Sequence, residues 1–179
     1  MLRAAAVSKK VPLPPWSSRT PSEKLAHVLA VWFGCGHMPG MPGHTGTAGA
    51  IPLYLLVRPH GLLALAATAA AITAIGTWAA NVECRVLKTK DPQIVVIDEV
   101  AGVLITWLAA PTGWKGTLAG FLLFRLFDQF KPFPSRWAER NLPNGWGVMF
   151  DDVFAGAWGA ATLLVALRIP ALAHYLVPA

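Results

Sequence analysis

The chain alternates long apolar segments with short polar ones, a pattern typical of a helical membrane protein. The clearest apolar segment, residues 61–82, carries no charged side chain and has about the length that crosses the hydrocarbon core of a bilayer. Four further segments are shorter or interrupted, and they cover residues 25–37 together with 46–57, then 95–110, 116–130 and 153–168. The pattern predicts an all-α fold, a multi-pass membrane bundle of four or five helices.

Local signals place the start of the first helix and a break after it. Thr20 and Glu23 have the spacing of a capping box, which predicts a helix from there to about Phe33. Residues 34–47 hold five glycines and two prolines, so we expect no regular helix in them. We interpret them as a re-entrant Gly/Pro-rich loop whose free amides and hydroxyls suit an anionic group. A surface turn between two short helices is the alternative.

The last apolar segment has its own start signal and a stripe of small side chains. Residues 144–147 read Asn-Gly-Trp-Gly and predict a turn, with a helix beginning near Asp151. Small residues follow at Ala155, Gly156 and Gly159, a spacing that lets a neighbouring helix approach closely.

Composition supports one membrane domain. The 179 residues are 55% hydrophobic and 13% charged, and their mean hydropathy is positive, which argues against a water-soluble globule. We expect residues 1–19 to form a flexible basic segment and residues 20–179 a single membrane-embedded domain. Five tryptophans near the predicted boundaries are interpreted as an interfacial belt: Trp16, Trp107, Trp114, Trp137 and Trp146.

The net charge of +6 would suggest nucleic acid as a partner of a soluble protein, but the positions of the charges indicate a bilayer. Basic residues gather in three alternate segments, namely the N-terminal region, residues 83–94 and residues 131–150. The positive-inside rule places these segments in the cytoplasm. All nine acids lie in or near the same segments. We therefore expect a membrane protein with its site facing the cytoplasm and no nucleic-acid partner.

Acidic residues within apolar segments are the candidate functional residues. Such placement is costly, about 3 kcal/mol at a bilayer centre, so intramembrane acids usually serve function. Two of these acids at 4 Å would repel by roughly 4 kcal/mol at an effective dielectric of about 20, so the cluster needs cations or protons. Arg125 and Lys131 can offset part of that charge, and an oxygen-only ligand set suits Mg²⁺. The acids are Asp98, Glu99, Asp128, Asp151 and Asp152.

A purely structural interpretation is the alternative for these acids. In it, Arg125 pairs with Asp128 within one helix, Asp151 and Asp152 cap the last helix, and the acids at 98 and 99 face the membrane interface.

The positions of the histidines and cysteines limit which reaction mechanisms are possible. His37 and His44 could protonate a leaving group or bind phosphate, because imidazole titrates near neutral pH, although plain hydrogen bonding is the commoner role of a loop histidine. Neither Cys35 nor Cys84 has an arginine at the sixth following position, which excludes a cysteine-based phosphatase loop. The chain also lacks the Asp-x-Asp pair of two-aspartate phosphotransferases.

Four motifs resemble those of one family. VVIDEVAG at 95–102, GFLLFRLFDQFKPFP at 120–134 and NGWGVMFDDVFAG at 144–156 are similar to the three acidic motifs of the bacterial phosphatidylglycerophosphatase A family. FGCGHMPGMPGHTGTAGAIP at 33–52 resembles its N-terminal glycine loop. The resemblance implies a Mg²⁺-dependent lipid phosphatase of the bacterial cytoplasmic (inner) membrane that converts the membrane phospholipid phosphatidylglycerophosphate to phosphatidylglycerol.

The resemblance also implies roles by motif position. The catalytic residues would be Asp98, Glu99, Asp128, Lys131, Asp151 and Asp152, and the metal ligands Glu99, Asp128, Asp151 and Asp152. The substrate phosphate would be bound by Arg125, Lys131, Gly43, His44, Thr45 and Thr47. The glycine loop departs from the usual Pro-Gly-Thr-x-Gly-Ser by reading Pro-Gly-His-Thr-Gly-Thr, which keeps a hydroxyl at the last position.

Two functions from other classes compete with a phosphatase. A cation transporter or channel with an intramembrane acidic ion site predicts acids spread through the membrane depth. A structural membrane subunit predicts that neutralising the acids has no effect on function.

Overall fold

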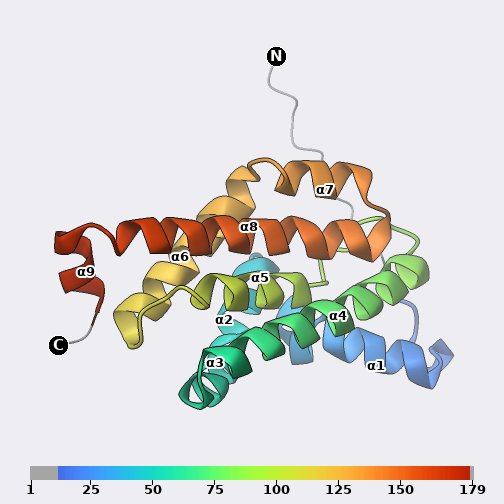
Figure 1. The fold of residues 1–179 in the computed structure, drawn as a ribbon. Coiled ribbons are helices and arrows are strands. Elements are labelled where there is room, and N and C mark those ends of the chain that lie inside the picture. The colour runs from blue at the N-terminus through green and yellow to red at the C-terminus, as the bar shows by residue number, and fades with distance from the viewer. Residues whose placement is uncertain (1–11, 178–179) are drawn as a thin grey trace.

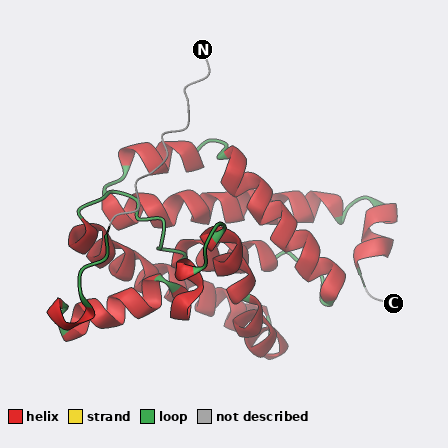
Figure 2. Cartoon of the chain, turned by 180° about the vertical axis from the view of Figure 1, so that it is seen from behind, coloured by secondary structure: helices red, strands yellow, loops and turns green. Residues whose placement is uncertain are grey.

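The computed structural model describes residues 12–177, and in this range it has helices joined by loops and no strands, as predicted (Figures 1 and 2). The α-helices are α1 (Pro21–Ala30), α2 (Pro42–Gly49), α3 (Ile51–Val57), α4 (Leu62–Leu87), α5 (Ile97–Trp107), α6 (Trp114–Phe130), α7 (Ser135–Asn141), α8 (Asn144–Ala166) and α9 (Pro170–Leu176). Three short 3₁₀ helices cover Trp16–Ser18, Trp32–His37 and Arg58–His60.

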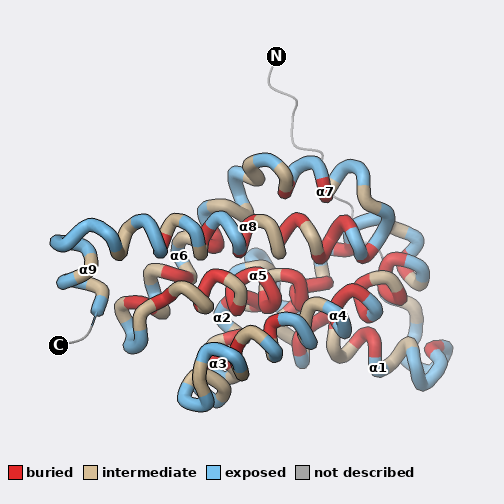
Figure 3. The backbone as a smooth tube through the Cα atoms, in the orientation of Figure 1, coloured by how far each residue is buried: buried red, intermediate tan, exposed pale blue. Residues whose placement is uncertain are grey.

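Helix α5 is the centre of the bundle. Nine of its eleven residues are buried, and it packs against α4, α6 and α8 (Figure 3). Burial of an almost entirely apolar helix on all sides is the main stabilising term of the core. Because α5 begins with an Asp-Glu pair, this central position also carries two carboxylates into the bundle.

Small residues bring α5 and α8 into close contact. A side-chain carbon added at Gly156 would collide with the backbone of Gly102, and one added at Gly159 would lie 2.7 Å from Thr106 Oγ1. The Thr106 hydroxyl lies 3.2 Å from the carbonyl oxygen of Gly102 and 3.1 Å from that of Gly156, across the helix pair. The predicted small-residue contact is confirmed, and it places the acids of α5 beside those of α8.

The start of α8 corrects the sequence prediction. The helix begins at Asn144, and the residues expected to form a turn are its first residues. The amide of Gly145 donates to Asn81 Oδ1 at 3.1 Å, and a side chain on Gly145 would meet the α4 backbone. The glycines therefore serve helix packing, and Asp151 and Asp152 lie about two turns inside the helix.

The Gly/Pro-rich segment is more regular than predicted. Phe33 and Gly34 adopt positive φ angles of 54° and 106°, which end the first helical region, and α2 then forms with Pro42 at its start. The expectation that residues 34–47 contain no regular helix is wrong for the second half, because proline at the first helical position needs no backbone donor. The re-entrant path stays a prediction.

Within residues 12–177, two helices, α4 and α8, are long and apolar enough to cross a membrane. Helix α5 has eleven residues and α6 seventeen. Four or five membrane crossings therefore stay a prediction. Trp107, assigned above to an interfacial belt, is fully buried and packs on Tyr54 with ring centroids 4.6 Å apart. That assignment is wrong, because α5 is a core helix.

The N-terminal region is tied to the bundle before α1. The capping box of Thr20 and Glu23 is present as predicted. Arg19 is buried and forms a two-point ion pair with Glu83 of α4, whose carboxylate also lies 3.3 Å from His27 Nδ1. Most of the segment predicted to be flexible, residues 1–11, lies outside the described residues.

Candidate active site

One cavity of about 500 Å³ collects the acids that the sequence singled out. It is lined from five parts of the chain: the start of α2, the loop between α4 and α5, the start of α5, the end of α6, and α8. Its charged lining consists of the five predicted acids, both predicted bases and one further acid, Asp91. These residues are Asp91, Asp98, Glu99, Arg125, Asp128, Lys131, Asp151 and Asp152. Segments more than 100 residues apart in sequence thus meet at one end of the bundle.

Two pairs of adjacent acids share the same local geometry. Asp98 Oδ1 accepts a hydrogen bond from the Glu99 amide at 3.0 Å, and Asp151 Oδ1 accepts one from the Asp152 amide at 3.0 Å. Asp98, Asp151 and Asp152 are buried, with exposed fractions of 9%, 6% and 3%. Asp98 and Glu99 lie in the first turn of α5, where the positive end of the helix dipole favours negative charge.

Arg125 connects three elements of the cavity. Its Nη1 lies 3.0 Å from Asp128 Oδ2 on the same helix and 3.8 Å from Glu99 Oε1 on α5. The same nitrogen donates to Thr47 Oγ1 on α2 at 3.3 Å. The helical Arg125–Asp128 pair of the structural alternative is present, and the contact with Glu99 extends it to a second helix.

Lys131 forms the second cationic centre. It ends α6 in a left-handed conformation, φ 45°, and its Nζ lies 2.6 Å from Asp151 Oδ2 and 2.9 Å from Glu139 Oε1. Burial lowers the pKa of Lys131, but the carboxylates of Asp151 and Glu139 outweigh this and raise it above the ordinary value. Lys131 is therefore a cation at neutral pH, beside the acids of α8.

Helix α2 approaches Glu99 through two glycines. A side-chain carbon on Gly43 would collide with Glu99 Oε1 and lie 3.1 Å from Arg125 Nη2, and one on Gly46 would lie 2.8 Å from Glu99 Oε2. Only glycine lets the helix lie this close to the carboxylate.

The remaining predicted phosphate-binding residues divide into two groups. Gly43 and His44 line the cavity. The Thr45 hydroxyl donates to backbone carbonyls of Pro42 and Cys35, and the buried Thr47 hydroxyl donates to the Gly43 carbonyl. Neither threonine lines the cavity, so their contact with phosphate stays a prediction.

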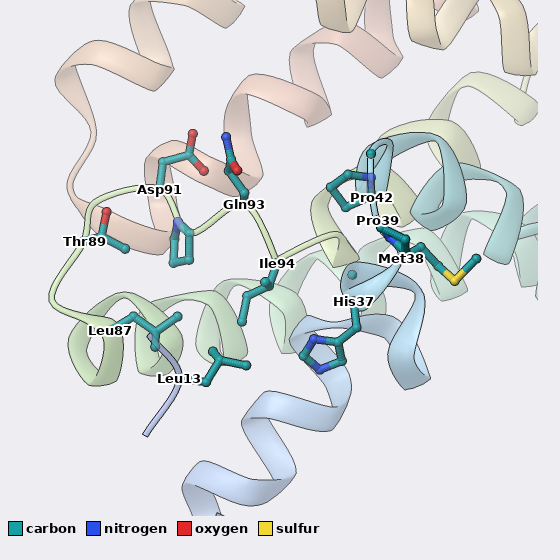
Figure 4. A pocket seen from close by; sticks show the side chains of 13 residues that line it. Leu13, His37, Met38, Pro39, Pro42, Leu87, Thr89, Asp91, Gln93 and Ile94 are labelled. Atoms are coloured by element: carbon teal, nitrogen blue, oxygen red, sulfur yellow. The ribbon is translucent and has the colours of Figure 1, made fainter. Parts of the chain in front are cut away.

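A second cavity of about 420 Å³ adjoins the first and shares Asp91 and Gln93 with it (Figure 4). His37 lines this second cavity, not the acidic one, and its Nε2 lies 3.2 Å from Nε2 of His27. Burial and the neighbouring His27 lower the pKa of His37. Asp91, Gln93 and Glu139 were not predicted from the sequence, because polar side chains outside apolar segments are ordinary and give no signal. Gln129, within an apolar segment, was not predicted either, because it carries no charge.

The donor chemistry of the acidic cavity fits a divalent cation. Six carboxyl groups face two cationic side chains, and Glu99 Oε2 is buried without a hydrogen-bond partner among the described residues. Carboxylate oxygens are the ligands that Mg²⁺ prefers. In the described part of the chain, however, no three His, Cys, Asp or Glu side chains converge into a complete metal site in this arrangement. The magnesium prediction thus has fitting ligands and stays a prediction.

Comparison with known proteins gives a consistent family. The family model described as phosphatidylglycerophosphatase A matches residues 28–167. The chain is 38% identical over 140 residues to phosphatidylglycerophosphatase A of Escherichia coli, covering 76% of this chain and 80% of that relative. The Haemophilus influenzae protein of the same name is 37% identical over 134 residues, covering 74% of this chain and 82% of its own.

A third relative has a different name. A Bacteroides thetaiotaomicron protein named putative phosphatidylinositol-3-phosphatase is 39% identical over 148 residues, covering 78% of this chain and 91% of its own. No solved structure matches the chain significantly. With the three acidic motifs gathered at one cavity and the family model matching most of its length, this chain belongs to the phosphatidylglycerophosphatase A family of phosphatases.

Proposed function

We propose that this protein is a Mg²⁺-dependent lipid phosphatase of the bacterial inner membrane that converts phosphatidylglycerophosphate to phosphatidylglycerol at its cytoplasmic face. The observation that carries the proposal is the meeting of six carboxyl groups, one guanidinium and one ammonium group at a single cavity. A cavity of acids alone would repel a phosphate dianion, and the two cations with a metal ion make it attractive.

Arg125 and Lys131 bind the phosphate in this proposal. Arg125 carries five N–H donors, and its contacts with Asp128 and Thr47 leave others for substrate oxygens. Lys131 is a fixed cation beside Asp151, so it can stabilise negative charge that develops on the phosphoryl oxygens. Both side chains are positioned by ion pairs before substrate arrives, which lowers the cost of organising the site.

Glu99, Asp128, Asp151 and Asp152 would hold the magnesium ion, and the remaining cavity acids would orient it and the attacking group. When bound, Mg²⁺ supplies Lewis-acid polarisation of a phosphoryl oxygen and neutralises charge. Hydrolysis adds a water oxygen to phosphorus and breaks the bond from phosphorus to the glycerol oxygen. That oxygen leaves with a proton, which His44 at the cavity can donate.

The direct test is phosphate release by the purified full chain from phosphatidylglycerophosphate in mixed micelles, with and without Mg²⁺. We expect turnover that chelation abolishes and Mg²⁺ restores. Asp128→Asn and Glu99→Gln should each lower kcat/KM by at least about 100-fold, as the loss of charged groups at a reaction centre commonly does. Glu23→Gln is the matched control, because Glu23 lies in the capping box of α1, away from the cavity.

A lipid panel tests the substrate. Phosphatidylinositol 3-phosphate and phosphatidic acid carry the same phosphomonoester on other alcohols, and the name of the Bacteroides relative makes the first a necessary comparison. A higher kcat/KM on either lipid would refute the proposed substrate while leaving the phosphatase intact. Full activity of both acid variants would refute the proposed site.

No observation favours the transporter. The acids gather in one cavity at the start of α5, at the end of α6 and about two turns inside α8, and two bases lie among them. An ion path would need acids along the bundle.

A further inference from the structure

The end of the bundle opposite the acidic cavity holds an apolar groove with two unsatisfied polar groups. Helix α6 runs from Trp114, at the far end of this groove, to Asp128, at the cavity. The two linings are nearest on this helix at Phe121 and Arg125, about one helical turn apart. Helix α5 runs the other way, from Asp98 at the cavity to Trp107, which packs on Tyr54 of the groove.

The groove has a volume of about 760 Å³ and lies between α3 and the start of α6. Its walls are aliphatic and aromatic, with Ile51 and Leu55 on one side and Leu118 and Phe121 on the other. Its volume is within the range of about 300–1,000 Å³ that is usual for ligand sites.

Two polar groups at the groove have no partner in the protein. The Tyr54 hydroxyl and Arg58 Nε are both buried and make no hydrogen bond within the described residues. Tyr54 is only 2% exposed. A buried polar group without a partner is costly, and both of these can donate a hydrogen bond. The missing partner is therefore an acceptor, and beside an arginine the best acceptor is an anion.

The charge at this end is uniformly positive. Arg58, Lys115 and Arg168 form no ion pair with an acid in the described part of the chain. The sequence has no acidic residue between Glu23 and Glu83, none between residues 99 and 128, and none after 152. Arg58 therefore has no acidic neighbour in sequence that could neutralise it.

We propose that this groove binds one anionic phospholipid of the surrounding bilayer, with a phosphate oxygen at Arg58 and Tyr54 and an acyl chain along the apolar walls. The combination of an apolar groove, a buried hydroxyl and an unpaired guanidinium matches the two parts of such a lipid. Trp114, 69% exposed beside the groove, has the position of an interfacial indole at the headgroup level. This site is separate from the proposed reaction and does not depend on it.

The test is lipid retention by the delipidated full chain in mild detergent, measured by native mass spectrometry with phosphatidylserine, phosphatidylglycerol or phosphatidylcholine added. Phosphatidylserine is included because it is anionic and not the product of the proposed reaction. We expect one anionic lipid per chain, held about tenfold more tightly than phosphatidylcholine. Arg58→Gln should reduce this retention about tenfold and Tyr54→Phe about threefold.

Two controls locate the lipid. Arg168→Gln removes a charge from the same end but not from the groove lining, and Asp128→Asn alters the acidic cavity; both should retain the anionic lipid as the unaltered chain does. Leu118→Trp, which fills the groove, should lose the anionic lipid. This variant tests the location of the lipid if Arg58→Gln does not fold.

Three results would overturn the proposal. Equal loss of the anionic lipid in Arg58→Gln and Arg168→Gln would mean that general charge attraction, not the groove, holds the lipid. Equal retention of phosphatidylcholine would mean that no phosphate charge is recognised. Absence of bound lipid together with a dimer that Leu118→Trp disrupts would assign the groove to a second copy of the chain.

Discussion

The close approach of Gly43 to Glu99 predicts that a small substitution at position 43 lowers activity without lowering stability. In Gly43→Ala the new methyl group would collide with Glu99 Oε1 and stand 3.1 and 3.2 Å from the two terminal nitrogens of Arg125. Ordinary van der Waals contact begins at about 3.5 Å, so the carboxylate must move by roughly 1 Å. A misplacement of that size can reduce turnover about 100-fold, which corresponds to about 2.7 kcal/mol of transition-state stabilisation.

The same substitution should leave the fold intact. The atoms that must move are the ends of two side chains, and alanine is a better helix former than glycine by about 1 kcal/mol. We therefore expect kcat/KM on phosphatidylglycerophosphate to fall about 100-fold while the midpoint of thermal unfolding in detergent stays the same or rises.

Gly61→Ala is the matched control with the opposite result. Gly61 has a φ of +97° and open space around the added carbon, and it lies at the other end of the bundle, before α4. Its ψ of 172° places it in a region that glycine almost alone adopts, so alanine there costs about 1–3 kcal/mol of backbone strain. Stability should fall and kcat/KM should not. Full activity in a stable Gly43→Ala variant would refute the role of a fixed Glu99 carboxylate in the reaction.

Three further substitutions test separate parts of the structure. Lys131→Met removes the cation beside the acids of α8 and should lower kcat/KM by about 100- to 1,000-fold on the same substrate; an unchanged value would exclude Lys131 from catalysis. Thr106→Val removes the hydroxyl that contacts the Gly156 carbonyl of α8 and the Gly102 carbonyl of its own helix, and it should cost about 1–2 kcal/mol, seen as a fall of about 2–8 °C in unfolding midpoint. Glu83→Gln leaves the buried Arg19 without its anion and should cost about 3–5 kcal/mol in denaturant unfolding, whereas Glu23→Gln should cost less than about 1 kcal/mol; equal costs would contradict the pairing.

The acids of the site were predictable because their local surroundings are apolar. Asp98, Asp128 and Asp151 each interrupt a hydrophobic run, and a charge in such a run needs a reason that can be stated without a structure. Asp91 lines the cavity and Glu139 contacts Lys131, but both lie in polar segments, where a carboxylate is common and does not indicate function. Only folding brings Asp91 to the cavity and Glu139 to Lys131.

The predicted helix boundaries were wrong where a residue far away in the sequence determines them. The apolar run that predicts α4 stops at residue 82, yet the helix continues to Leu87 through a charged stretch. Glu83 is tolerated there because Arg19, which is 64 residues away in sequence, binds its carboxylate. A local pattern cannot contain that information. The early start of α8 has the same cause, since the Asn81 side chain on α4 holds the first residues of the helix.

The structure also changes the energetic argument for the site. The cost of about 3 kcal/mol applies to an acid at a bilayer centre, but Asp98 and Glu99 occupy the first turn of α5 and Asp128 the last turn of α6. Glu99 and Asp128 contact Arg125, and Asp151 contacts Lys131, so these carboxylates are paired with cations and avoid part of that cost. Their depth alone therefore no longer argues for function. What indicates function is that helices running in opposite directions all present carboxylates at the same end of the bundle. Repulsion among these carboxylates would oppose folding unless a ligand cation or the paired bases offset it.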